Sequence, residues 1–93
     1  MSKVWKKINQ EVQGKGLNPN FVYAICYAES SLNANAESSV ARGMMQLMKY
    51  TAKVVAKEAK LPYSISGLTR DPEYNIKLGS YYFNGLIEDY NGV

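Results

Sequence analysis

Apolar residues recur every three or four positions along the first part of the chain, which is the spacing of one face of an α-helix. Ser2 precedes this run and is a residue type that caps helices, whereas Gly14 and Gly16 follow the run and end it. The pattern therefore predicts a first amphipathic helix between these residues. Its apolar face is predicted to contain Val4, Trp5, Ile8 and Val12.

A second helix is predicted from Asn18 and Pro19, because asparagine caps helices and a proline at the first helical position loses no hydrogen bond. Glu29 lies four residues after Ile25 and eight after Phe21, so we expect it to project from their face, close to the helix end. A carboxylate is thus predicted to point toward the interior. The inward face is predicted to comprise Phe21, Val22, Ile25 and Cys26.

The composition changes after this helix. Residues 30–42 are rich in Ser, Asn and Ala, which favour irregular structure, and at residues 43–48 the sequence GMMQLM predicts a short extended or turn segment. A third helix is predicted over residues 50–60, and a long fourth helix over residues 71–89, where an acidic cap and a proline come first. The expected fold class is mainly α, with about four helices in a single domain over residues 1–93.

The carboxylate of Glu29 needs an explanation if it lies on an apolar face, because an ionised group in such surroundings is costly. In one interpretation, partial removal from water lets Glu29 keep a proton and act as an acid catalyst. In the other, Glu29 bonds the backbone of the following loop, or a lysine, and has only a structural role. The spacing of residues leaves both interpretations open.

Composition excludes several classes of protein. The chain has one cysteine, Cys26, and no histidine, so an internal disulfide, a cysteine-based zinc cluster and a histidine-dependent triad are excluded; we expect no metal and no cofactor. The longest apolar stretch, residues 21–28, is shorter than the roughly 20 residues that span a bilayer. The net charge of +3 comes from scattered lysines, which favours solvated helix faces and argues against nucleic acid as a partner.

Three segments carry a family resemblance. They are AESSLN at residues 28–33, GMMQLM at residues 43–48 and DPEYNIKLG at residues 71–79. Their order and spacing resemble the signatures of the soluble lytic transglycosylase domain, and the resemblance covers about the whole chain. That family belongs to the lysozyme-like superfamily and cleaves peptidoglycan. The resemblance therefore implies a lysozyme-like α+β fold and the glycan strands of peptidoglycan as the partner.

Glu29 matches the single catalytic acid/base of the family. The resemblance implies that Glu29 protonates the glycosidic oxygen between MurNAc and GlcNAc. It then takes the proton of the C6 hydroxyl group, which closes onto C1 as a 1,6-anhydro ring. Most glycosidases use two carboxylates, and here the N-acetyl and C6 hydroxyl groups of the substrate are implied to take the second role. Glu37 is the best other carboxylate, with a solvated loop position as its expected role.

The resemblance also implies substrate contacts. Ser38 matches a serine near the N-acetyl group of the substrate, with a hydrogen bond inside the loop as the alternative. Gln46 matches a glutamine beside the cleft, with a bridge inside the loop as the alternative. Met45, like the other methionines of its segment, is expected to fill the core, and it also qualifies to line the cleft. Tyr82 is expected to pack behind the acid or to stack on a sugar.

Three departures from the family pattern bear on activity. The spacing from Glu29 to Gly43 is one residue shorter than the family pattern, and Lys49 stands where the family often has proline. The sequence ends at Val93, before the A-Y-N-A-G-P segment that completes the cleft in the family. We therefore expect a more exposed Glu29, an isolated chain with weak or no activity, and a second copy or another partner over the open apolar surface.

The sequence thus predicts a peptidoglycan lytic transglycosylase, located in the bacterial cell wall or periplasm or associated with a phage. A hydrolytic muramidase is the first alternative. A wall-binding or assembly module without catalysis is the second, and a helical nucleic-acid-binding domain, which rests on the net charge alone, is the third.

Overall fold

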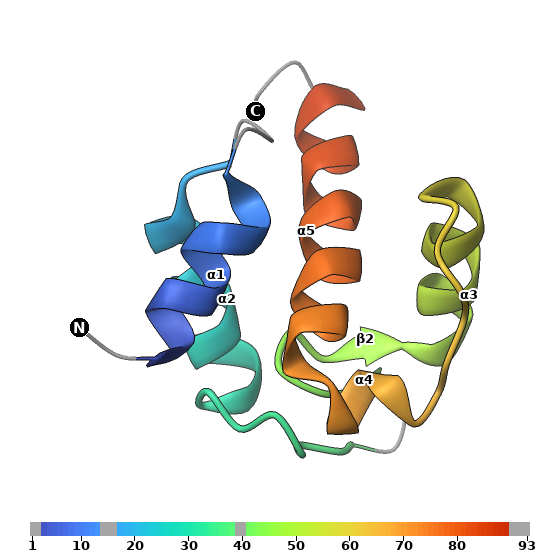
Figure 1. The fold of residues 1–93 in the computed structure, drawn as a ribbon, viewed down its shortest axis with the longest axis horizontal. Coiled ribbons are helices and arrows are strands. Elements are labelled where there is room, and N and C mark those ends of the chain that lie inside the picture. The colour runs from blue at the N-terminus through green and yellow to red at the C-terminus, as the bar shows by residue number, and fades with distance from the viewer. Residues whose placement is uncertain (1–2, 14–16, 39–40, 90–93) are drawn as a thin grey trace.

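The long helix α5 (Pro72–Asp89) runs between two groups of elements (Figure 1). Helices α1 (Lys3–Val12) and α2 (Pro19–Ser30) lie on one side of α5, and α3 (Lys49–Glu58) lies on the other. Among the described residues we find no helix whose length and hydropathy suit a membrane crossing. The structure is a computed structural model that describes residues 3–13, 17–38 and 41–89.

A short antiparallel hairpin connects the loop after α2 to α3. Strand β1 (Ala41–Arg42) pairs with strand β2 (Leu47–Met48), so that Ala41 lies opposite Met48 and Arg42 lies opposite Leu47. The four residues between the strands form the turn, and α3 begins directly after β2. The short extended segment predicted at GMMQLM is therefore confirmed.

The structure has one helix that the sequence did not predict. Helix α4 (Gly67–Arg70) is a single turn and ends where the Asp71 N–H donates to the carbonyl of Gly67, 3.0 Å away. A helix of four residues is too short to show a period of 3.6, so no pattern could have revealed it. The predicted long helices are confirmed as α1, α2, α3 and α5.

Local capping signals explain where two of the long helices begin. Asn18 Oδ1 accepts a hydrogen bond from the Asn20 N–H at 2.9 Å, with Pro19 at the first helical position. Asp71 Oδ1 accepts from the Tyr74 N–H at 3.1 Å at the start of α5. The cap predicted at Ser2, the glycines at 14 and 16, and the side chain of Val4 lie outside the described residues.

Two clusters of buried side chains pack on different faces of α5. The first, called the α2-side core, contains Ile8, Val12, Leu17, Val22, Cys26, Met44, Met45 and Ile76. The second, called the α3-side core, contains Leu47, Ala52, Val55, Ala56, Leu68 and Leu78. Ile76 and Leu78 are two positions apart on the helix and therefore point in nearly opposite directions. Helix α5 thus serves as the shared wall of both cores.

Candidate active site

Helix α2 buries only part of the face that the sequence predicted, with Ile25 half-buried against the α2-side core. Val22 and Cys26 are fully buried and Ser30 is nearly so, whereas Phe21 is 50% exposed. Glu29 belongs to the exposed class of residues, so the prediction that its carboxylate points into the interior is wrong. The sequence FVYAICYA is apolar nearly all round the helix, so periodicity alone could not fix which face is buried.

The end of α2 places Glu29 at the surface and Ser30 beneath it. The chain turns at Ser31, whose φ is 53°, and the Leu32 N–H reaches back to the carbonyl of Cys26 at 3.3 Å. Ser30 Oγ lies 2.8 Å from the carbonyl oxygen of Cys26 and 2.6 Å from that of Met44. The hydroxyl group next to Glu29 therefore ties the end of α2 to the turn between β1 and β2.

Glu29 lines a cavity of about 160 Å³, called here the Glu29 pocket. Its other lining residues are Met45, Gln46, Leu47, Met48, Thr51, Tyr82 and Phe83. The side chains come from α2, the β1–β2 turn, β2, α3 and α5. Four of the five predicted site residues, Glu29, Met45, Gln46 and Tyr82, therefore meet at one place. The sequence did not predict the other four lining residues, Leu47, Met48, Thr51 and Phe83, as part of a site.

Ser38 lies apart from this group. Its hydroxyl accepts a hydrogen bond from the Ala41 N–H at 2.9 Å, and its own N–H donates to the carbonyl of Ala41 at 3.0 Å. Ser38 lines neither the Glu29 pocket nor the larger cavity described below. The structure thus places this side chain in the loop hydrogen bond that was its alternative role, and contact with a substrate stays a prediction.

Gln46 has an unusual backbone and a fully engaged amide nitrogen. Its φ is 50°, in the left-handed region, which closes the turn. Nε2 donates to the carbonyl oxygens of Ala36 at 3.1 Å and Gly43 at 2.9 Å, so both of its hydrogens are used within the loop. The predicted bridge inside the loop is present, and the amide oxygen is the group left to accept a hydrogen bond from a ligand.

The methionines divide between core and surface. Met44 and Met45 are 3% and 2% exposed, which agrees with their predicted role in the core, and Met45 also lines the Glu29 pocket. Met48 is 52% exposed, so its predicted burial is wrong. Neighbouring side chains of a strand point to opposite faces, and in β2 Leu47 takes the buried face.

The charged groups near the pocket are few. The side chain of Glu37 is 60% exposed and its Oε1 lies 3.6 Å from Arg42 Nε, which matches the solvated loop position expected for it. Glu37 does not line the Glu29 pocket, where Glu29 is the single carboxylate among the lining residues. In the part of the chain that the structure describes, no group of three Asp, Glu, Cys or His side chains is arranged to hold a metal ion.

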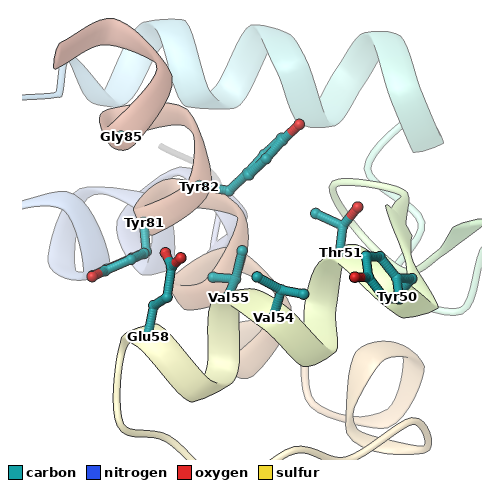
Figure 2. Close-up of a pocket in the computed structure, with 8 residues that line it drawn as sticks. All are labelled: Tyr50, Thr51, Val54, Val55, Glu58, Tyr81, Tyr82 and Gly85. Atoms are coloured by element: carbon teal, nitrogen blue, oxygen red, sulfur yellow. The ribbon is translucent and has the colours of Figure 1, made fainter. Parts of the chain in front are cut away.

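A larger cavity of about 280 Å³, called the α3–α5 groove, lies between those two helices (Figure 2). Helix α3 supplies Tyr50, Thr51, Val54, Val55 and Glu58, and α5 supplies Tyr81, Tyr82 and Gly85. The carboxylate of Glu58 extends toward Tyr81 in Figure 2. Thr51 and Tyr82 line both hollows, so the groove and the Glu29 pocket are neighbours.

Comparisons with known proteins give consistent results. The family model described as the Transglycosylase SLT domain matches residues 6–93. A protein of Haemophilus influenzae named as a soluble lytic murein transglycosylase is 39% identical over 83 residues, which is 88% of this chain and 14% of that protein. The soluble lytic murein transglycosylase of Escherichia coli K12 is 35% identical over 79 residues, which is 83% of this chain and 12% of that protein.

Solved structures show the same fold. The crystal structure of the 70-kDa soluble lytic transglycosylase of E. coli superposes with a TM-score of 0.85 at 31% identity, over 94% of this chain and 14% of that chain. A complex of the 70-kDa soluble lytic transglycosylase with bulgecin A gives a TM-score of 0.87 at 29% identity over the same shares. The predicted mainly α, lysozyme-like fold is thereby confirmed, for a chain that spans about one seventh of these proteins.

Proposed function

Because the chain belongs to the transglycosylase SLT domain family, we propose that it cleaves the glycan strands of peptidoglycan, with Glu29 as the acid/base. The relatives named above are called lytic murein transglycosylases, and murein is peptidoglycan. The observation that carries the proposal is the meeting of Glu29, Met45, Gln46 and Tyr82 around one pocket. The family resemblance selects these four residues from the sequence, together with Ser38, which lies elsewhere.

The proposed reaction breaks the β-1,4 bond between MurNAc and GlcNAc. The protonated carboxyl group of Glu29 gives its proton to the glycosidic oxygen as the C1–O bond breaks, and GlcNAc leaves with a free 4-hydroxyl group. The resulting carboxylate takes the proton of the MurNAc C6 hydroxyl, and O6 bonds to C1. The products are a 1,6-anhydro-MurNAc end and a new GlcNAc end, Glu29 regains its proton, and no water is consumed.

The proposed roles of the other residues follow from their chemistry. The amide oxygen of Gln46 is available to accept a hydrogen bond from a sugar hydroxyl or an N-acetyl N–H. Tyr82 is half-buried and meets Phe83 edge to face, with ring centroids 5.6 Å apart, so its ring is fixed beside the pocket. Glu29 is exposed without a ligand, so its carboxyl group is open to an approaching glycan strand.

A wall-binding or assembly module is the second candidate, and the exposure of Glu29 favours it. A carboxylate on the surface can accept hydrogen bonds from sugar hydroxyls without taking part in bond cleavage. Under either function we propose that the chain acts in the bacterial envelope or on it from a phage. The expected partner over the open apolar surface also stays a prediction.

One experiment separates these functions. Purified peptidoglycan is incubated with the chain, and the soluble products are analysed by mass spectrometry. Fragments with 1,6-anhydro ends support the proposal, whereas fragments that are heavier by one water identify a hydrolytic muramidase. Sedimentation of the chain with peptidoglycan, without release of fragments, identifies the binding module. If the chain neither binds peptidoglycan nor releases fragments from it, both functions are ruled out.

A further inference from the structure

One face of α5 carries two residues of the DPEYNIKLG segment that the proposed reaction does not use, Asn75 and Gly79. They are four positions apart and therefore lie one above the other on the helix. Tyr82 and Phe83, which line the Glu29 pocket, follow on the same side one turn later. This face of α5 therefore runs from a buried asparagine to the wall of the pocket.

Asn75 uses its whole side-chain amide to hold the turn between β1 and β2. Its Oδ1 accepts a hydrogen bond from the Met45 N–H at 2.8 Å. Its Nδ2 donates to the carbonyl oxygens of Arg42 at 3.0 Å and Leu68 at 2.9 Å. Asn75 is fully buried, so no water competes for these bonds. The amide thereby fixes the backbone on both sides of Gly43 and Met44.

Gly79 leaves the space that the side chain of Met45 occupies. A Cβ atom at position 79 would lie 2.4 Å from Met45 Sδ and 2.9 Å from Met45 Cε. Both distances are shorter than any normal contact between carbon or sulfur atoms. Asn75 thus binds the backbone of Met45, and Gly79 admits its side chain.

The turn is also held from the side of α2. Ser30 Oγ lies 2.6 Å from the carbonyl oxygen of Met44, directly beside the residue that Asn75 binds. The Met45 backbone is therefore fixed between α5 and the end of α2, which carries Glu29. A shift of α5 relative to the turn would move Met45 and Gln46 with respect to the Glu29 carboxylate.

We propose that Asn75 and Gly79 are positioning residues that hold Met45 and Gln46 at the wall of the Glu29 pocket. The way in which these two residues hold the turn does not depend on the proposed function. The expected effect of this placement on catalysis does rest on that function. Catalytic rates depend steeply on such placement, because a displacement of about 1 Å costs roughly 100-fold in rate.

Gly79→Ala tests the proposal with a matched control on the same helix. Alanine forms helices better than glycine, which offsets part of the cost of displacing Met45, and kcat is therefore compared at equal folded fraction. Gly85→Ala makes the same change where a Cβ atom meets nothing within 4 Å. We expect a loss of about 10- to 100-fold in kcat on soluble glycan strands for Gly79→Ala, and no loss for Gly85→Ala.

Asn75→Asp tests the same placement from the backbone side. The aspartate keeps an acceptor for the Met45 N–H but has no N–H to donate to the carbonyls of Arg42 and Leu68. Ile8→Val, a small change in the buried α2-side core, controls for a general loss of stability. At equal folded fraction we expect Asn75→Asp to lower kcat far more than Ile8→Val does. We expect the same variant to change KM by a smaller factor than kcat.

Nuclear magnetic resonance without substrate reads the placement directly. Gly79→Ala and Asn75→Asp should shift the Met45 methyl and the Gln46 side-chain amide signals, whereas Gly85→Ala should leave them in place. Unshifted signals in Gly79→Ala and Asn75→Asp would overturn the proposal. Shifted signals in these variants without a greater loss of kcat than in the control variants would overturn it as well. If the wild type cleaves nothing, the proposed function fails, and the signals alone decide the placement.

Discussion

The two hollows beside Tyr82 differ in what lies behind them. The Glu29 pocket is the smaller, at about 160 Å³, and its wall is tied by buried hydrogen bonds from Ser30 and Asn75. The α3–α5 groove is larger, at about 280 Å³, and is flanked by exposed side chains such as Tyr50 and Tyr81. Groups fixed by buried bonds keep their geometry when a ligand binds, so the smaller hollow is the better place for catalysis.

The packing beneath the two hollows explains this difference. Below the groove, the α3-side core consists of Leu47, Ala52, Val55, Ala56, Leu68 and Leu78, whose apolar side chains pack without directional bonds. Below the Glu29 pocket, buried amide and hydroxyl groups join residues 14 and 30 positions apart in the sequence. Such bonds set relative positions within tenths of an ångström, which apolar contacts alone do not.

Replacing the glutamate of each hollow should give the largest contrast. Glu29→Gln removes the transferable proton and is expected to lower turnover of peptidoglycan by about 100- to 10,000-fold, the usual contribution of acid/base catalysis. Glu58→Gln makes the same change in the α3–α5 groove and is expected to leave turnover within about twofold, because an exposed carboxylate outside the site contributes little. Release of soluble fragments measures both.

The unfolding midpoint in urea serves as the control for this pair. Both glutamates are exposed, so neither variant should lose stability. Equal turnover in the two variants would remove the distinction between the hollows and the catalytic assignment of Glu29 together.

Gly43→Ala should damage the wall of the Glu29 pocket. Gly43 has a φ of 82°, and a Cβ atom there would lie 1.9 Å from the carbonyl oxygen of Leu68 and 2.2 Å from Asn75 Nδ2. Left-handed strain and overpacking together should cost about 2–5 kcal/mol of unfolding free energy. Urea unfolding measures this, with Gly85→Ala as the control. A change below about 0.5 kcal/mol would mean that the turn is not held as tightly as its contacts indicate.

Two buried serines give a contrast of intermediate size. Ser30→Ala removes the hydroxyl between the carbonyls of Cys26 and Met44 and should cost about 1–3 kcal/mol of unfolding free energy. Among the described residues, Ser80 Oγ is buried without a hydrogen-bond partner, so Ser80→Ala should be neutral or stabilising. Thermal unfolding compares the two. Equal losses would show that volume, rather than the hydrogen bond, determines the effect of Ser30→Ala.

Local signals made much of the fold predictable. The caps at Asn18 and Asp71 act within three residues, so α2 and α5 start where the sequence indicates. The family resemblance also pointed to Glu29, Gln46 and Tyr82, and the structure gathers these three residues around one pocket.

Features that depend on distant partners were not predictable. The buried face of α2 is chosen by neighbours on α1, α5 and the turn, because its own sequence is apolar on most sides. Ser30 rather than Glu29 is buried, and its hydroxyl bonds the carbonyl of Met44. A single sequence does not reveal this long-range hydrogen bond.

Cys26 provides the mildest test of the core behind the Glu29 pocket. Its thiol is fully buried, and burial raises the pKa of Cys26 from 9.0 to about 12. The unfolded chain therefore loses this proton first, so the stability that the neutral thiol contributes is complete below pH 9.0 and is lost between pH 9.0 and about 12. No comparable buried titrating group is found among the residues described in the α3-side core.

The measurement compares urea unfolding of the wild type and Cys26→Ala at pH 7 and pH 10. The alanine variant lacks the thiol and therefore does not lose this stability at high pH. Relative to the wild type, its unfolding free energy should be higher by about 1 kcal/mol at pH 10 than at pH 7. Tyrosines and lysines titrate alike in both proteins, so their effects cancel. A difference independent of pH, together with rapid alkylation of Cys26 in the folded protein, would show that this core opens to water and cannot hold the pocket rigid.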